Sequence, residues 1–222
     1  MRKIPTQLRA KQRVERILDA TEALLIERGV GTLTVNDIAT RAEVPIGSMY
    51  QYFNNRDEVL YALCDRHYRI LGSAADGYFT NVRTVADFTR DVRKALYLCW
   101  DYTNGNAAFR ELFFDVQAWG IVREIDWQDT LLNAERMSGA LHSLVSYVPR
   151  ESVLALCIII GDSASSTARI AVRVEALRDE LFKQFVAMVE SRVFTLLRDN
   201  AALETAAHAL LDAAPEAAAY AK

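Results

Sequence analysis

The residues best suited to chemistry lie in one short stretch, and their chemistry is recognition. Ser48 and Gln51 are three positions apart, so a helix would present them, with Ile46, toward solvent. A glutamine amide can pair with adenine through two hydrogen bonds, and a serine hydroxyl can bond to a base edge or a phosphate. These side chains predict a helix that reads the major groove of double-stranded DNA.

Catalytic interpretations have little support. The run Gly161-Asp-Ser-Ala-Ser resembles a nucleophile elbow, but it lacks the final glycine and has no strand before it. The glycines after Arg28 lack the third member of a dinucleotide-binding loop. The three histidines share no metal-binding spacing. We therefore expect a protein that is not an enzyme, with no catalytic residues, no metal and no cofactor.

Three short helices are expected to position the Ser48–Gln51 face. Apolar residues recur at helical spacing over 14–25, and Gly29 ends that first helix. Thr34, followed three residues later by Asp37, predicts the capping box of a second helix.

The third helix is expected over residues 45–53, because Pro45 suits the first turn of a helix. Two short helices joined by a tight turn form a helix-turn-helix, here at about residues 34–53. We expect a DNA-binding domain with a basic N-terminal arm over residues 1–55 and a larger effector-binding and dimerisation domain over 56–200. Residues 201–222 form an Ala-rich tail that is expected to be a short helix or disordered.

Strand signals are nearly absent, so the fold class expected is all-α. Beyond the third helix, further helices are expected at about 56–78, from Thr84 to a break at 103–106, and at 107–118, 121–147, 150–173 and 175–199.

Charge is distributed unevenly along the chain. Residues 1–56 carry nine Lys/Arg and six Asp/Glu, a net charge of +3, whereas the whole chain carries −3. The remainder therefore carries −3 − 3 = −6. This pattern is typical of a basic module that meets a polyanion, although an ordinary solubilising tail explains the charge equally well.

Composition indicates a cytoplasmic protein without a membrane role. Three widely spaced cysteines match no disulfide or metal framework and fit a reducing compartment. The longest apolar run, Val153 to Ile160, is too short to cross a bilayer, and the first 20 residues lack the apolar stretch of a secretory signal.

The run TVNDIATRAEVPIGSMYQYFNNRDEVL, from Thr34 to Leu60, is similar to the signature of the tetracycline-repressor (TetR/AcrR) family. The resemblance covers about residues 11–65, and beyond them only length and helical layout agree. It implies a helix-turn-helix regulator in which a defined set of residues meets bases or phosphates. The residues at base edges are Pro45, Ile46, Gly47 and Ser48, and those at the DNA backbone are Thr34, Tyr50, Tyr52 and Arg56. Gln51 joins the predicted DNA-binding set through its amide chemistry.

Two positions depart from the family pattern. Glu43 stands where the family usually has glycine, which predicts a strained backbone at a cost of roughly 1 kcal/mol. Tyr52 replaces a frequent histidine and keeps a polar ring tip. Arg56 has two interpretations, a solvated charge or a phosphate ligand, and its unfavourable place at a helix N-terminus favours the second.

Aromatic residues concentrate in the middle of the chain, where the family binds effectors. We expect an apolar or aromatic effector beside Trp100, Phe109, Phe113, Trp119 and Trp127, with ordinary core as the alternative for each. The neighbouring acids Glu124, Asp126 and Asp129 suit a cationic ligand, but a solvated helix face is the preferred interpretation.

The last two helices carry enough apolar surface for a symmetric four-helix interface. The residues expected there are Gly161, Ser165, Ala168, Phe185, Met188 and Val189. The alternative is that these rows are buried within one subunit. The resulting hypothesis is a homodimeric repressor that a small effector releases from a palindromic operator. An activator, and an all-α ligand-binding or interaction protein without DNA binding, remain open.

Overall fold

The computed structural model describes residues 8–114 and 116–212, with side chains described over 8–114 and 120–196. These residues form helices and turns without a strand, which confirms the all-α fold. The helices are α1 (Leu8–Arg28), α2 (Val35–Arg41), α3 (Ile46–Met49), α4 (Arg56–Ala74), α5 (Val85–Gly105), α6 (Ala107–Phe114), α7 (Val116–Leu144), α8 (Arg150–Arg173) and α9 (Arg178–Asp212), with short 3-10 turns η1 (Val30–Thr32) and η2 (Glu175–Leu177).

Helix starts follow the capping residues of the sequence. The Asp37 backbone N–H donates to Thr34 Oγ1 at 3.2 Å, and the Thr34 N–H donates to the Asp37 carboxylate at 3.1 Å. Thr84 and Asp87 make the same reciprocal pair at the start of α5. These caps satisfy N–H groups that lack a partner inside the helix, so they fix where each helix begins.

Helix ends were harder to predict. Helix α3 is one turn long, and residues 50–52 continue it as turns, whereas a helix to residue 53 was expected. Helix α4 ends at Ala74 and not at 78. Helix α9 continues through Asp212, so the first half of the expected tail is helix; residues rich in Ala, Leu and Glu favour this extension.

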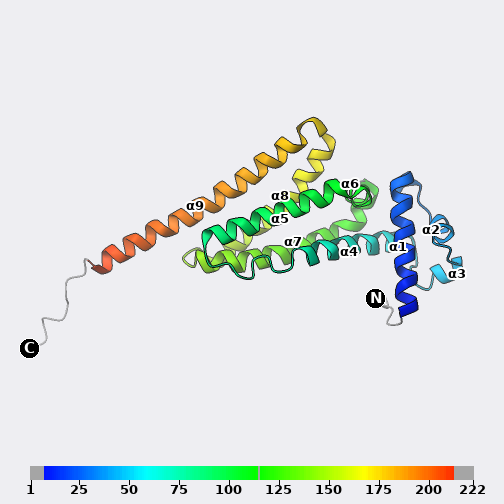
Figure 1. Ribbon diagram of the computed structural model, residues 1–222, viewed down its shortest axis with the longest axis horizontal. Coiled ribbons are helices and arrows are strands. Elements are labelled where there is room, and N and C mark those ends of the chain that lie inside the picture. Colours follow the sequence, from blue (N-terminus) through cyan, green and yellow to red (C-terminus); the bar gives the residue numbers. More distant parts are fainter. Residues whose placement is uncertain (1–7, 115, 213–222) are drawn as a thin grey trace, which may run out of the picture.

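The helices form two connected parts (Figure 1). Helix α1 stands across one end of an elongated bundle built from α4 to α9, and α2 and α3 lie on its far side. Helix α9 leaves the opposite end of the bundle, so the C-terminal part of this helix lies far from α3. The helix-turn-helix is therefore held at one extremity of the molecule.

Two of the three hydrophobic clusters among the described residues correspond to these parts, and the third joins Leu71 of α4 to Phe109 and Phe113 of α6. The first contains buried residues of α1, α2, α3 and the beginning of α4, together with Leu112, Val122 and Ile125 of the bundle. The second lies among α5, α7, α8 and α9. The domain boundary expected between residues 55 and 56 therefore does not separate two cores, because α4 and α6 supply residues to the first.

Helix α8 is long and apolar enough, by length and composition alone, to cross a membrane. It packs most extensively against α7 and also against α9. Only 22% of its most apolar window is buried within the subunit. This helix therefore presents apolar side chains outward, among them Ile159 and Ile170, which are 61% and 51% exposed.

Candidate DNA-reading face and effector cavity

The helix-turn-helix buries one face of α3 and exposes the other. Met49 and Phe53 are buried against Ile38 and Val44, which fixes the crossing of α2 and α3. Ile46 and Tyr50 are 42% and 53% exposed, although both are large and apolar enough for a core. The predicted DNA-binding residues divide into two groups. Thr34, Pro45, Ile46, Gly47, Tyr50 and Gln51 are exposed, whereas Ser48, Tyr52 and Arg56 are half-buried.

The turn between the two helices contains the strained residue that the sequence predicts. Glu43 has φ = 53°, in the left-handed region that favours glycine. The Glu43 N–H donates to the Thr40 carbonyl at 3.2 Å, and the Val44 N–H donates to the Ala39 carbonyl at 3.0 Å. These bonds and the buried Val44 side chain hold a conformation that an isolated glutamate would leave.

Arg56 has partners within the chain. Its guanidinium donates to the Val30 carbonyl at 3.5 Å and pairs with Asp57 at 3.4 Å. These contacts tie the start of α4 to η1, so a structural role accompanies any contact with DNA. Arg56 is therefore not only a solvated charge of the first turn, and its contact with a phosphate stays a prediction.

Arg66 fixes α1 on the bundle. This arginine of α4 contacts three carboxylates of α1: Glu15 at 3.4 Å, Asp19 at 2.6 Å, and Glu22. The Arg66 side chain is 18% exposed, so these pairs are less screened than ordinary surface salt bridges. The cluster fixes the angle at which the helix-turn-helix leaves the bundle.

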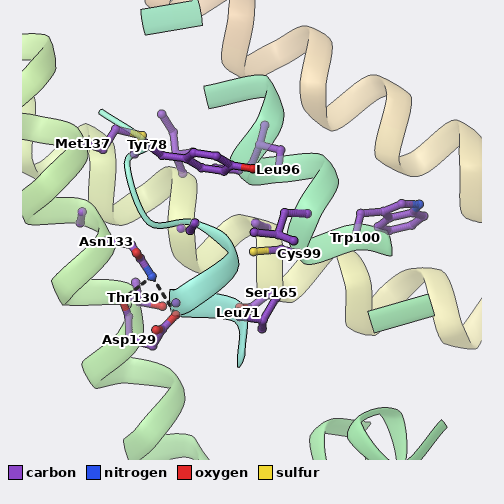
Figure 2. A pocket seen from close by; sticks show the side chains of 18 of the residues that line it. Leu71, Tyr78, Leu96, Cys99, Trp100, Asp129, Thr130, Asn133, Met137 and Ser165 are labelled. Carbon is purple, nitrogen blue, oxygen red and sulfur yellow. Dashed lines mark hydrogen bonds between the residues drawn. The ribbon is translucent and has the colours of Figure 1, made fainter. Parts of the chain in front are cut away.

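A cavity of about 160 Å³ lies inside the bundle among α4, α5, α6, α7 and α8. Most of its wall is apolar, and Figure 2 shows Cys99 of α5 across from Asp129, Thr130 and Asn133 of α7. An engineered cavity of about 150 Å³ is large enough to bind benzene. The cavity can therefore hold an aromatic ring.

Three of the five aromatic residues predicted for an effector site line this cavity: Trp100, Phe109 and Phe113. Trp127 does not, because it is 44% exposed on the outer side of α7. Trp119 belongs to α7, but its side chain is outside the described residues. Tyr68 of α4, Tyr78 of the loop after α4 and Phe182 of α9 also line the cavity. They were not predicted, because these segments are remote in sequence from the aromatic stretch.

One wall of the cavity is acidic. Asp126 and Asp129 both line it, which corrects the interpretation of these acids as a solvated helix face. Burial raises the pKa of both carboxyls, that of Asp129 to about 6. Their places on α7 could have been found from spacing, because Asp126, Asp129, Thr130 and Asn133 share one helical face.

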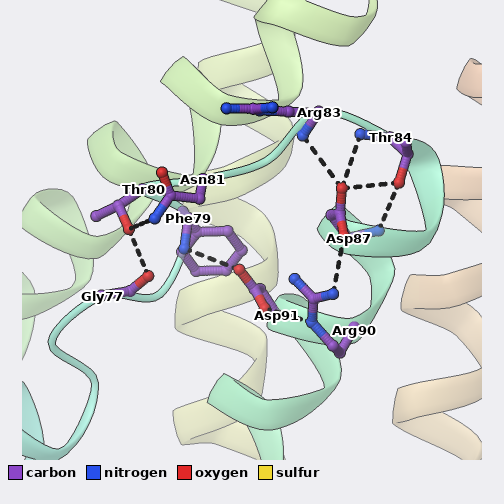
Figure 3. Close-up of polar contacts among 9 residues, drawn as sticks. All are labelled: Gly77, Phe79, Thr80, Asn81, Arg83, Thr84, Asp87, Arg90 and Asp91. Carbon is purple, nitrogen blue, oxygen red and sulfur yellow. Dashed lines mark hydrogen bonds and ion pairs between the residues drawn. The ribbon is translucent and has the colours of Figure 1, made fainter.

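The α4–α5 loop contributes to the wall of the cavity. Tyr78 and Phe79 line that wall, and Phe79 has φ = 62°, an unusual value for a bulky residue. Figure 3 shows the polar contacts that hold Phe79 and its neighbours in this loop. The Phe79 N–H donates to the buried Asp91 carboxylate at 3.1 Å, and Arg90 pairs with that carboxylate at 3.1 Å. Asp91 thus anchors a strained loop above the cavity.

The predicted dimer residues lie mostly inside the subunit. Gly161, Ser165 and Ala168 line the cavity, and a Cβ on Gly161 would lie 3.2 Å from Thr130 Cγ2. Their small size serves the close approach of α8 to α7. Phe185 and Val189 are buried in the second core, and only Met188, at 68% exposed, faces outward.

These features define a class of protein: a helix-turn-helix module on a helical domain that contains a ligand-sized cavity. Residues 17–63 match the family model described as bacterial regulatory proteins, tetR family. The match covers the helix-turn-helix part of this chain, from α1 into α4.

Relatives and solved structures extend the comparison. HbdR, a transcriptional regulator of Aromatoleum sp. (strain CIB), is 29% identical over 93 residues, 41% of this chain and 38% of that protein. TtgR, a transcriptional regulator of Pseudomonas putida, is 38% identical over 60 residues, 27% of this chain and 29% of that protein. The aligned segments thus span well under half of either relative.

The fold match is longer. The crystal structure of a TetR-family transcriptional regulator from Syntrophomonas wolfei superimposes with a TM-score of 0.66 at 16% identity, covering 83% of this chain and 96% of that one. The likeness therefore reaches from the helix-turn-helix through the bundle. Within the part of the chain that the structure describes, no three His, Cys, Asp or Glu side chains gather as a metal site.

Proposed function

We propose that the protein is a cytoplasmic, sequence-specific transcriptional repressor that a small apolar or aromatic effector releases from DNA. The observation that carries the proposal is the position of α4. Its first turns belong to the core of the helix-turn-helix, through Val59 and Leu60, and its later turns line the cavity, through Tyr68 and Leu71. One rigid helix therefore joins the reading face to the ligand space.

Helix α6 supplies a second connection. Leu112 is fully buried in the first core, and the adjacent Phe113 lines the cavity. A ligand that displaces Phe113 acts on the same short helix that supports α1. Such a ligand binds one of two orientations of the DNA-binding part more tightly than the other. It can change the DNA affinity only by as much as its own affinities for the two orientations differ.

A dimer follows from the outer surface of α8 and α9. Ile159, Ile170 and Met188 are more than half exposed, at 61%, 51% and 68%. An exposed apolar surface of this kind marks an interface more often than a free surface. A two-fold interface here would place two reading faces on a palindromic operator whose half-sites lie about one helical turn apart, or a multiple of it.

Selection from a random DNA library tests the proposal without knowledge of the operator. The purified protein is expected to enrich duplexes with two inverted half-sites, and its affinity for them should exceed that for scrambled duplexes by at least about 10³-fold at moderate salt. Enrichment of no motif, with equal binding to all duplexes, would contradict it.

A further inference from the structure

We propose that the cavity binds an amphipathic cation: an aromatic or apolar body with one ammonium group, held by Asp126 and Asp129. This inference rests on the proposed function and names the chemical class of its effector. It starts from the placement of two carboxylates within one turn of α7 on the wall of a mostly apolar cavity, which Arg136 also lines.

Asp126 has an oxygen available to a ligand. Tyr68 Oη donates to Asp126 Oδ1 at 2.7 Å, and Ser165 Oγ donates to the same oxygen at 3.2 Å. Among the described residues, none donates a hydrogen bond to Oδ2, although Asp126 is only 7% exposed and lines the cavity. A carboxylate oxygen that lines a poorly solvated cavity can accept a further hydrogen bond, so a donor from a ligand would be favourable there.

Asp129 repeats this arrangement one turn along α7. Asn133 Nδ2 donates to Asp129 Oδ2 at 2.8 Å, and no described side chain donates to Oδ1. Figure 2 shows this pair beside Thr130, across the cavity from Cys99. Two partly satisfied carboxylates therefore face the same space.

The nearby arginines do not cancel this charge. Arg136 favours the charged form of Asp129, and Arg169 favours that of Asp126, but burial outweighs each effect and raises both pKa values. Arg169 also lies 5.3 Å from the centre of the Phe113 ring, so its charge is shared with an aromatic face. A ligand cation would lower the cost of keeping two acids charged in a poorly solvated space.

The aromatic residues of the cavity wall favour a ligand that carries an aromatic ring beside its charge. Phe109 and Phe113 stack at 5.4 Å beside Tyr68, the residue that donates to Asp126. An aryl group can pack on these rings while an ammonium a few bonds away reaches the carboxylates, and the ring faces themselves attract cations. A neutral hydrocarbon would gain only the packing, and an anion would meet like charge.

Calorimetric titration of the full-length protein at pH 7.5 with three matched probes tests the inference. The probes are 2-phenylethylammonium, its neutral isostere n-propylbenzene, and the anion 3-phenylpropanoate. We expect the cation to bind roughly tenfold or more tightly than the hydrocarbon, and the anion to bind most weakly. Asp126→Asn and Asp129→Asn should each reduce the preference for the cation while leaving hydrocarbon binding intact, which shows that the cavity is still folded.

Glu124→Gln is the matched control, because it removes an acid from the exposed side of the same helix and should leave the preference unchanged. A cation that binds no tighter than the hydrocarbon, a preference that survives both Asn substitutions, or no binding of the cation would overturn the inference. If the protein still selects palindromic DNA in that case, the proposed function stands and only the effector class is wrong. Failure to select DNA would instead remove the proposed function.

Discussion

Tyr68 on α4 donates a 2.7 Å hydrogen bond to Asp126 on α7, and this bond joins the helix that enters the DNA-binding core to the acidic wall of the cavity. Burial and the adjacent Asp126 charge raise the pKa of Tyr68, so its hydroxyl stays protonated and remains the donor at neutral pH.

Tyr68→Phe is therefore expected to leave a buried carboxylate oxygen with one donor fewer. The loss should lower the free energy of unfolding by about 1–3 kcal/mol. For a domain of this size the melting temperature should fall by roughly 2–4 °C per kcal/mol. Thermal unfolding measures the change. Tyr97→Phe, at a tyrosine that is 48% exposed, is the control; an equal shift in both variants would show that the Tyr68–Asp126 bond has no special role.

His67 predicts a pH dependence of stability. It is 1% exposed, its Nδ1 lies 2.7 Å from Tyr102 Oη, and burial, with a smaller effect of Arg66, lowers its pKa to about 4. Because the unfolded residue has a pKa near 6.5, the unfolded chain takes up the proton first as pH falls. Stability should decrease from pH 6.5 toward pH 4.

His67→Phe should remove this component. We expect the wild type to lose on the order of 2 kcal/mol more than the variant between pH 7 and pH 5, measured by denaturant unfolding at each pH. Parallel pH profiles for the two proteins would show that His67 is not held neutral by burial.

Replacing Glu43 with glycine should stabilise the fold. A glycine at its φ of 53° avoids the Cβ strain, so Glu43→Gly should raise the free energy of unfolding by up to about 1 kcal/mol, despite the greater freedom of glycine in the unfolded chain. Glu43→Gln is the control, because it removes the charge and keeps the Cβ. A gain of equal size in both variants would assign the effect to charge and not to the backbone.

A charge placed on the exposed apolar surface of α8 and α9 should disrupt the proposed dimer. Met188→Asp should convert a dimer to monomers in sedimentation velocity, because it buries an unpaired charge in the proposed interface. Ile26→Asp places the same charge on an apolar residue that is 56% exposed on α1 and should leave the assembly unchanged. A wild-type monomer, or a dimer that tolerates Met188→Asp, would contradict the proposed interface.

Local signals in the sequence predicted much of the DNA-binding part. Thr34 and Asp37 set the start of α2, and Glu43 was expected in a strained turn, because each depends on neighbours within a few residues. The cavity was predicted only in part. Trp100 and Trp127 are equally aromatic, and only the packing of α5 and α7 decides that the first lines the cavity and the second faces outward.

The small residues of α8 illustrate the same limit. Gly161 and Ser165 permit close helix approach, but sequence does not say whether the approaching helix comes from the same chain or from a partner. Here the neighbour is α7, and Ser165 donates to Asp126. Spacing placed Asp126 and Asp129 on one face of a helix, whereas burial of that face depends on tertiary contacts.

DNA reading by α3 and the turn that continues it is tested most directly by fluorescence anisotropy. The measurement uses a duplex from upstream of the gene and a scrambled duplex, over a salt series, for the wild type, Gln51→Ala in that turn and Arg56→Ala at the start of α4. The wild type should prefer the upstream duplex at moderate salt. Gln51→Ala should lose about 1–3 kcal/mol of that preference, and Arg56→Ala should weaken both duplexes and reduce the salt slope by about one. Equal, weak binding of both duplexes by all three proteins would contradict sequence-specific reading by α3.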